Sequence, residues 1–430
     1  MKSDSDRCCR QLPNAPAWVM HALGPREARR FTAHLARCAQ CAAEVRATRG
    51  TLDMIDATSP ASPHPELTDR ILHAVAAEAA RPPEGRRPAF TLALGGAVAA
   101  AVAGLIGLVF WRQATIRQTE SIAQLAGNMN AQMRQAADWI AAQQEADGTW
   151  HPSRTGGNDV YLPALTGLAL LALQRQAPAT HAGAIERAVA SLVAMQNESG
   201  AFCRTPGAQR YNHAFAAYAL LSLPDGLLRT PAVQAACNRA IDYAQRTQTP
   251  QGAWDYTDDG SGNTALSTWQ LAVLMQARLR GWPDDQGHLR RGLAWLRQQT
   301  DGHAFGYRIP GAPLAGRSGL TLTAMAASTL LEAARIYPAL QPEAVAAVSA
   351  LNTLRGDVVT ESEDYYRDYF LARVSEQQTD HVLMAEVCTR LARLGDTVPG
   401  GGVRWSATDA WGRSGGDLYA TSMAVLSRRF

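Results

Sequence analysis

The sequence predicts an all-α protein in which a small metal-binding helical domain, one transmembrane helix and an (α/α)6 toroid follow one another. Three observations predict this: the spacing His34-x3-Cys38-x2-Cys41, an uncharged apolar run over residues 89–111, and a glycine-containing loop that recurs from Gly148 onward. The expected parts are residues 1–60 (metal-binding domain), 61–88 (amphipathic helix and linker), 89–111 (transmembrane helix), 112–130 (stalk) and 131–430 (toroid).

The composition is that of folded domains rather than a disordered chain. Of 430 residues, 47% are apolar and 18% are charged, so the chain can bury cores. The net charge is only +3 and no basic stripe stands out, which argues against direct binding of nucleic acid.

The first 41 residues contain four of the seven cysteines. On a helix, His34 and Cys38 share a face because residues four apart lie one above the other, and Cys41 follows one turn later. Together with a third thiolate from Cys8 or Cys9, they form the tetrahedral Cys3His set that suits Zn²⁺. The sequence therefore predicts a zinc site and leaves its fourth ligand open between Cys8 and Cys9.

Residues 8–46, including LGPREARRFTAHLARCAQCAAEVR, resemble the zinc-binding anti-sigma domain family. The resemblance implies that the residues just named are zinc ligands and that the module binds an extracytoplasmic-function sigma factor. Family members typically carry an amphipathic helix before the membrane, and residues 65–80 fit because their apolar side chains form one stripe. A zinc knuckle without a sigma partner and a metal-free set of buried thiols are the alternatives.

The run over residues 89–111 is long enough to cross a bilayer. Its 23 residues carry no charge and would span about 34 Å as a helix, against about 30 Å for the hydrocarbon core. Arg81, Arg86 and Arg87 precede the run, whereas Arg112 and Arg117 follow it, a slight bias that places the N-terminus inside. Contact with membrane lipid, a cytoplasmic N-terminus and an extracytoplasmic C-terminal domain are therefore expected. A buried, alanine-rich soluble helix is the alternative.

The C-terminal region is an internal repeat. Gly148, Gly200 and Gly252 are 52 residues apart, Gly302 is 50 further on, and a related loop follows at Gly402. Between these loops, stretches that are apolar nearly all round alternate with amphipathic ones. All-round apolar helices are buried and amphipathic ones lie outside them, so the alternation predicts a double-layered helical ring. The predicted inner helices are 161–173, 212–223, 264–277, 320–334, 365–374 and 419–427, and the outer ones are 133–144, 184–195, 232–247, 289–299, 343–354 and 381–394.

With its Gln…Gly-x-Trp loops, this region resembles the squalene cyclase/prenyltransferase repeat superfamily over residues 131–430. Cyclases of that group protonate an alkene with an Asp-x-Asp-Asp acid, and prenyltransferases hold zinc with Asp-x-Cys and a distant histidine. The nearest acidic run, Asp255-Tyr-Thr-Asp258-Asp259, has one residue too many, and no downstream cysteine has the prenyltransferase context. The resemblance therefore implies the fold and favours a non-catalytic ring.

Polar residues recur near the starts of the predicted inner helices, where a ring would bring them to one mouth of its cavity. The candidates for a ligand cavity are Asp159, Tyr161, Tyr211, His213, Asp364, Tyr365, Tyr366, Asp368, Tyr369, Asp417 and Tyr419. Helix capping is the other interpretation, and it applies equally to Asn158, Asn263 and Ser318. A buried core histidine is the other interpretation of His213.

The sequence thus predicts a single-pass membrane regulator with a zinc module that binds a sigma factor and a toroid that binds a ligand or a partner protein. A membrane-anchored enzyme is the main alternative, either a polysaccharide lyase or hydrolase or a terpenoid-cyclase-like protein. A third is a membrane-tethered adaptor for some other partner. The distal cysteines, Cys203, Cys237 and Cys388, are expected to be buried free thiols. A disulfide between Cys203 and Cys237 is the alternative.

Overall fold

The computed structural model describes residues 25–38, 41–42, 45, 127–176, 178–203, 208–257, 260–313, 319–357 and 363–428. They fall in two compact units, Met1–Ala103 and Gly104–Phe430, and each unit is described by itself. Cys8, Cys9, the amphipathic segment and the predicted membrane run lie outside these residues. Among the residues that are described, no helix combines the length and apolarity needed to cross a membrane.

In the smaller unit, helix α2 (Pro25–Leu35) carries His34 in its last turn. Proline suits the first helical turn because that position needs no N–H donor and the ring fixes a helical φ. Phe31 on this helix is buried, as are Cys41 and Val45 beyond it. The Phe31 ring lies beside that of the predicted ligand His34, with ring centroids 6.0 Å apart.

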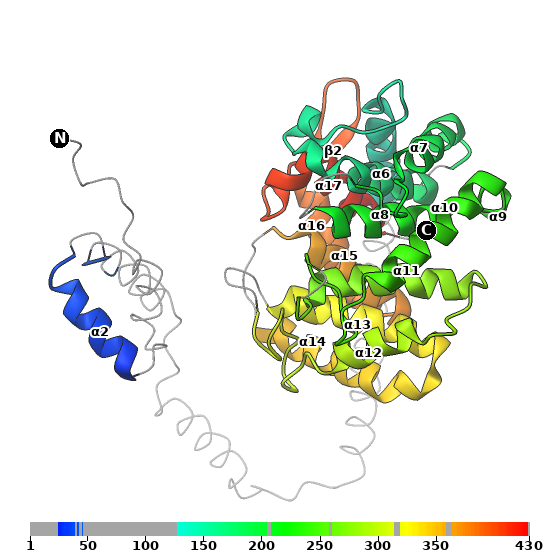
Figure 1. Cartoon of the computed structure of the whole chain (residues 1–430). Coiled ribbons are helices and arrows are strands. Elements are labelled where there is room, and N and C mark those ends of the chain that lie inside the picture. Colours follow the sequence, from blue (N-terminus) through cyan, green and yellow to red (C-terminus); the bar gives the residue numbers. More distant parts are fainter. Residues whose placement is uncertain are drawn as a thin grey trace, which may run out of the picture. The chain divides into compact units, whose positions relative to one another are not determined.

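The larger unit has a closed inner layer of helices (Figure 1). Each inner helix packs against the next, and the last one packs against the first, which closes the ring. Most side chains on every face of these helices are buried, as their apolar sequences predict. In order, the described inner helices are α6 (Leu162–Gln176), α8 (Gln209–Leu221), α11 (Thr264–Leu279), α13 (Gly319–Ile336), α15 (Tyr365–Gln378) and α17 (Gly412–Leu426).

An outer layer of helices covers the inner ring. It consists of a helix over residues 127–142, α7 (Ala182–Met195), α10 (Pro231–Arg246), α12 (His288–Arg297), α14 (Gln341–Asp357) and α16 (His381–Leu394). The remaining elements are short: η2 (Pro152–Thr155), η3 (Asp159–Tyr161), α9 (Asp225–Leu228), η4 (Pro338–Leu340), β1 (Gly395–Thr397) and β2 (Val403–Trp405). The antiparallel β1–β2 hairpin, in which Gly395 pairs with Trp405, is the one sheet among the described residues. The mostly helical, ring-closed architecture agrees with the predicted α/α toroid.

The recurring loops join neighbouring units of the ring. The side-chain amide of Gln196 donates to the carbonyl oxygens of Gly200 (3.0 Å) in its own loop and Ala236 (2.9 Å) on the next outer helix. Gln144 makes the same two bonds to Gly148 and Ala184. In the Gly302 loop, Gln298 occupies the equivalent position but is exposed, and the ion pair between Arg297 and Glu343 joins the units instead.

Candidate functional site

The predicted zinc ligands come together in the smaller unit. The ligand atoms of His34, Cys38 and Cys41 all lie within 4.8 Å of one another. Cys41 is fully buried, and the other two are partly buried. Zinc bonds of about 2.0–2.3 Å in a tetrahedron place neighbouring donor atoms about 3.3–3.8 Å apart, so this cluster is compact enough to hold the ion.

The donor set also fits zinc chemically. Two thiolates and one imidazole are the mixed sulfur and nitrogen donors of structural zinc sites, and a fourth donor completes such a site. That donor was predicted to be Cys8 or Cys9, which lie outside the described residues. The described part of the cluster thus provides three of the four ligands that the sequence predicts for a Zn²⁺ ion.

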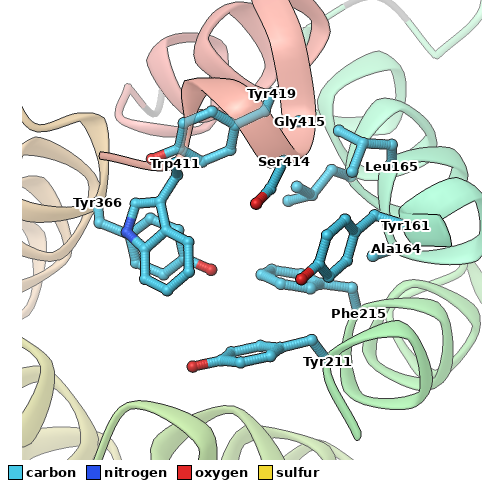
Figure 2. Close-up of a pocket in the computed structure, with 11 residues that line it drawn as sticks. Tyr161, Ala164, Leu165, Tyr211, Phe215, Tyr366, Trp411, Ser414, Gly415 and Tyr419 are labelled. Carbon is cyan, nitrogen blue, oxygen red and sulfur yellow. The ribbon is translucent and has the colours of Figure 1, made fainter. Parts of the chain in front are cut away.

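In the toroid, four of the predicted cavity residues line one small cavity. Tyr161 ends the short helix η3 just before α6, and Tyr211, Tyr366 and Tyr419 lie on three different inner helices. These four side chains surround the space together with Trp411 (Figure 2). We call this site the tyrosine pocket. Its volume is about 40 Å³, above the roughly 10–15 Å³ that a cavity needs in order to hold one water molecule.

A partly buried carboxylate supports the wall of the tyrosine pocket. Asp409 accepts hydrogen bonds from the Tyr419 hydroxyl (2.9 Å) and from the backbone N–H groups of Tyr365 (3.1 Å) and Trp411 (3.0 Å). Burial raises the pKa of Asp409, although these donors oppose the rise. Burial also raises the pKa of Tyr419 well above its usual value. The carboxylate thereby fixes the positions of two aromatic rings of the pocket.

Several predicted cavity residues have partners elsewhere. Asp159 lies at the surface, where its carboxylate contacts His151 and accepts a hydrogen bond from Ser153. Asp368 is buried and forms ion pairs with Arg367 and Arg390. Asp364 caps α15 by accepting from the N–H of Arg367 (2.9 Å), and Asp417 accepts from Arg404. These four carboxylates do not line the tyrosine pocket.

The other three predicted residues are also placed by packing. His213 is fully buried, with its ring centroid 4.4 Å from that of Tyr243, and burial lowers its pKa to about 3. Its imidazole is therefore neutral, as in a core histidine. The Tyr365 hydroxyl donates to the carbonyl of Ser406 (3.0 Å), and Tyr369 stacks on Trp269.

Capping explains two further helix-start residues. Asn158 accepts from the N–H of Val160 (3.0 Å) and Asn263 from that of Leu266 (2.8 Å), whereas Ser318 lies outside the described residues.

The three distal cysteines, Cys203, Cys237 and Cys388, are buried and free of disulfides. Burial raises the pKa of the Cys237 thiol to about 12.

Sequence reasoning missed several residues of the site, and three of them matter most here. Trp411 and Phe215 line the tyrosine pocket, and Asp409 supports it. Phe215 lies one helical turn after Tyr211 on α8, so the i, i+4 spacing pointed to it. Asp409 and Trp411 lie in the last loop and have no counterparts in the other repeats, so no recurrence marked them.

Two family models match this chain. The model of the squalene-hopene cyclase C-terminal domain matches residues 112–255, which include the first part of the toroid. A zinc-finger model matches residues 12–42, which include His34, Cys38 and Cys41. The N-terminal segment is thus similar to a zinc finger, and the geometry of its His34–Cys38–Cys41 cluster fits Zn²⁺.

One solved structure supports the fold of the larger unit. An α-amylase from Clostridium perfringens is similar at a TM-score of 0.50 and 9% identity, over 69% of this chain and 96% of that one. A protein from Actinoplanes is similar at a TM-score of 0.45 and 16% identity, over 70% and 98% of the two chains. At such identity the first likeness concerns the fold alone. No curated protein sequence matches this chain.

Proposed function

We propose that this protein is a membrane-anchored regulator of the anti-sigma type. Its zinc module binds an extracytoplasmic-function sigma factor in the cytoplasm, and its toroid binds a ligand or a partner protein on the other side of the membrane. The observation that carries the proposal is the His34–Cys38–Cys41 cluster within the segment that the zinc-finger model matches. A zinc ion there would fix the fold of a module too small to be stable on apolar burial alone.

The membrane anchor is supported by the sequence. The 23 uncharged residues over 89–111 have the length of a spanning helix. A site of free thiolates requires a reducing compartment, which agrees with a cytoplasmic N-terminus. The toroid would then lie outside the cytoplasm.

A non-catalytic role for the toroid is supported by the size and content of the tyrosine pocket. A cavity of about 40 Å³ is far below the roughly 300–1,000 Å³ of sites that enclose small molecules.

Asp255, in the nearest match to an acidic cyclase run, is paired in a bidentate manner with Arg308. Its pKa is lowered by these hydrogen bonds although burial acts in the opposite direction, so it is a poor proton donor.

Three observations favour a second candidate function, acid catalysis of the terpenoid-cyclase type. The raised pKa of Asp409, its position beside Trp411 and Tyr419, and the match to the squalene-hopene cyclase domain are the features that such a reaction would use. The volume of the adjoining cavity weighs against it. Turnover of an isoprenoid alkene that is lost in Asp409→Asn would favour this enzyme over the regulator.

The proposal is tested by capture of a sigma factor. The full chain, coexpressed with the extracytoplasmic-function sigma factors of its host, should retain one of them during purification. His34→Ala and Cys41→Ser should abolish that retention because each removes a zinc ligand. Cys237→Ala is the matched control, since it removes a buried cysteine of the toroid and should retain the sigma factor. Failure of the unaltered chain to retain any sigma factor would overturn the proposal.

A further inference from the structure

The walls of the tyrosine pocket consist mainly of aromatic rings. Phe215 joins the four tyrosines and Trp411 around the space, and none of the described residues that line it carries a charge (Figure 2). The ring of Trp411 is inclined by 64° to that of Tyr211 and by 36° to that of Tyr366. Because neighbouring rings are inclined, they curve around the space rather than stack across it. The faces of aromatic rings carry partial negative charge, so such a wall attracts cations.

The carboxylate beside this wall has no cationic partner. The hydrogen bonds to Asp409 come from one hydroxyl and two backbone N–H groups, and it forms no ion pair with any described residue. Two other carboxylates of the predicted cavity set do have one, since Asp417 is paired with Arg404 and Asp368 with Arg390. A partly buried carboxylate without a counter-ion is costly. A cation bound in the tyrosine pocket would compensate the charge of Asp409.

A second acidic group adds to this negative charge. Asp364 accepts from the Thr321 hydroxyl (2.6 Å) and from a backbone N–H group, and it too forms no ion pair within the described part of the chain. Burial raises the pKa of Asp409, and the charge of Asp364 adds to the rise because the two carboxylates lie close together. The Tyr419 hydroxyl donates to Asp409, which polarises the Tyr419 ring towards greater negative charge. These groups together favour positive charge in the tyrosine pocket.

The size of the tyrosine pocket limits what can enter it. Its volume of about 40 Å³ is about three times the 10–15 Å³ that one water molecule needs. A head group of a few heavy atoms fits this space, and the rest of a ligand would stay outside. Tyr161, Trp411 and Ser414 are partly exposed, so the pocket opens to solvent beside them. The remaining lining is alanine, leucine and glycine, which suits apolar groups.

From these features we infer that the tyrosine pocket binds the methylated ammonium head group of a small ligand, of which choline is the simplest example. Methyl groups spread the positive charge and pack against aromatic rings. A quaternary nitrogen has no N–H group, so it loses no hydrogen bond in an apolar wall. A metal ion would need several oxygen ligands that this lining does not offer. The inference rests on the proposed function, since it names the ligand class of the toroid.

The experiment uses the full chain in nanodiscs of phosphatidylethanolamine and phosphatidylglycerol, which contain no choline. Choline, tetramethylammonium and glycerophosphocholine are titrated by calorimetry at pH 8, where carboxylates are ionised. The control ligand is 3,3-dimethylbutanol, which has the shape of choline without its charge. Choline should bind saturably and about tenfold or more tightly than this control. Tighter binding of glycerophosphocholine than of choline would identify a lipid head group as the source, and the reverse would identify a free ammonium compound.

Substitutions separate the rings from the hydroxyl groups. Tyr161→Leu and Trp411→Leu should each weaken choline binding by about fivefold or more, because each removes a ring at the opening of the pocket. Tyr161→Phe keeps the ring and should bind choline normally. Asp409→Asn should weaken the binding of choline and leave that of 3,3-dimethylbutanol unchanged. Trp282→Leu is the matched control, since Trp282 is also partly buried but does not line the pocket.

Three outcomes would overturn the inference: no saturable binding of any ammonium probe, equal binding of choline and 3,3-dimethylbutanol, or unchanged choline binding in both leucine variants of the pocket. Melting temperatures show whether the variants fold, and the comparison of the two ligands on the unaltered chain does not depend on them. Sigma-factor retention is measured on the same preparation. Loss of choline binding with retention intact would refute the inference alone, and loss of retention with choline binding intact would refute the regulatory function alone.

Discussion

The side-chain amide of Gln248 donates a 2.9 Å hydrogen bond to the backbone carbonyl of His288, at the first residue of the next outer helix. The same amide donates to the carbonyl of Gly252, 2.8 Å away in its own loop. One side chain thereby fixes both the loop and the position of the neighbouring unit. The glutamines of the repeat are therefore joints between units rather than simple helix caps.

We expect Gln248→Ala to lower the free energy of unfolding by about 1–3 kcal/mol, because it leaves two partly buried carbonyls without donors. Chemical denaturation of the full chain, followed by circular dichroism, measures this loss. Gln298→Ala is the control, since Gln298 occupies the equivalent position in the Gly302 loop and is exposed. Equal effects of the two substitutions would contradict the role assigned to Gln248.

The glycine of the same loop motif is expected to tolerate no side chain. Gly200 has a φ of 84°, and a Cβ there would overlap the backbone carbonyl oxygen of Arg239 on α10. Gly200→Ala should therefore destabilise the toroid by more than about 1 kcal/mol, the usual cost of an unfavourable left-handed residue. Gly226→Ala should be neutral or slightly stabilising, because Gly226 lies in α9 and a Cβ added there would meet no atom within 4 Å. Thermal melting of the two variants makes this comparison.

Asp409 should make the toroid less stable as pH rises. Burial raises its pKa in the folded state, so the native chain binds this proton more tightly than the unfolded chain does. Stability is then greatest below the unfolded pKa of about 3.9 and falls as pH rises through the folded value. Asp409→Asn should lack this fall, and denaturant titrations at several pH values would reveal the difference.

Asp255→Asn provides the opposite sign as a control. Burial would raise the pKa of Asp255, but the hydrogen bonds from Arg308 lower it below the usual value of an aspartate. Its stabilising effect is therefore present above the unfolded pKa and is lost as pH falls through the folded one. Matching pH profiles for the two variants would show that the environment assigned to Asp409 is wrong.

Removal of the metal should affect the zinc module and leave the toroid intact. The purified chain should contain one zinc ion, and His34→Ala or Cys38→Ser should lose it because each removes a ligand atom from the cluster. Chelation should leave the melting temperature of the toroid unchanged. Metal analysis of Cys8→Ser and Cys9→Ser, made separately, identifies the fourth ligand as the one whose loss releases zinc.

The sequence alone determined the helical repeat and the partners in the zinc cluster. Both depend on local periodicity: apolar side chains at helical spacing define the two layers, and His34 and Cys38 share a helix face because they are four residues apart. The tyrosines at 161, 211, 366 and 419 were found because they recur at equivalent helix starts. The membrane run and the fourth zinc ligand remain predictions.

Only the tertiary structure decided which side chains face the axis of the ring. Consecutive helical residues point about 100° apart, so Tyr366 lines the tyrosine pocket whereas Tyr365 and Asp368 bind groups elsewhere. A hollow of about 570 Å³ likewise brings together Gln174 and Arg373, which lie on different inner helices far apart in the sequence. No local pattern encodes such a meeting, because ring closure between α17 and α6 is what brings distant helix ends to one mouth.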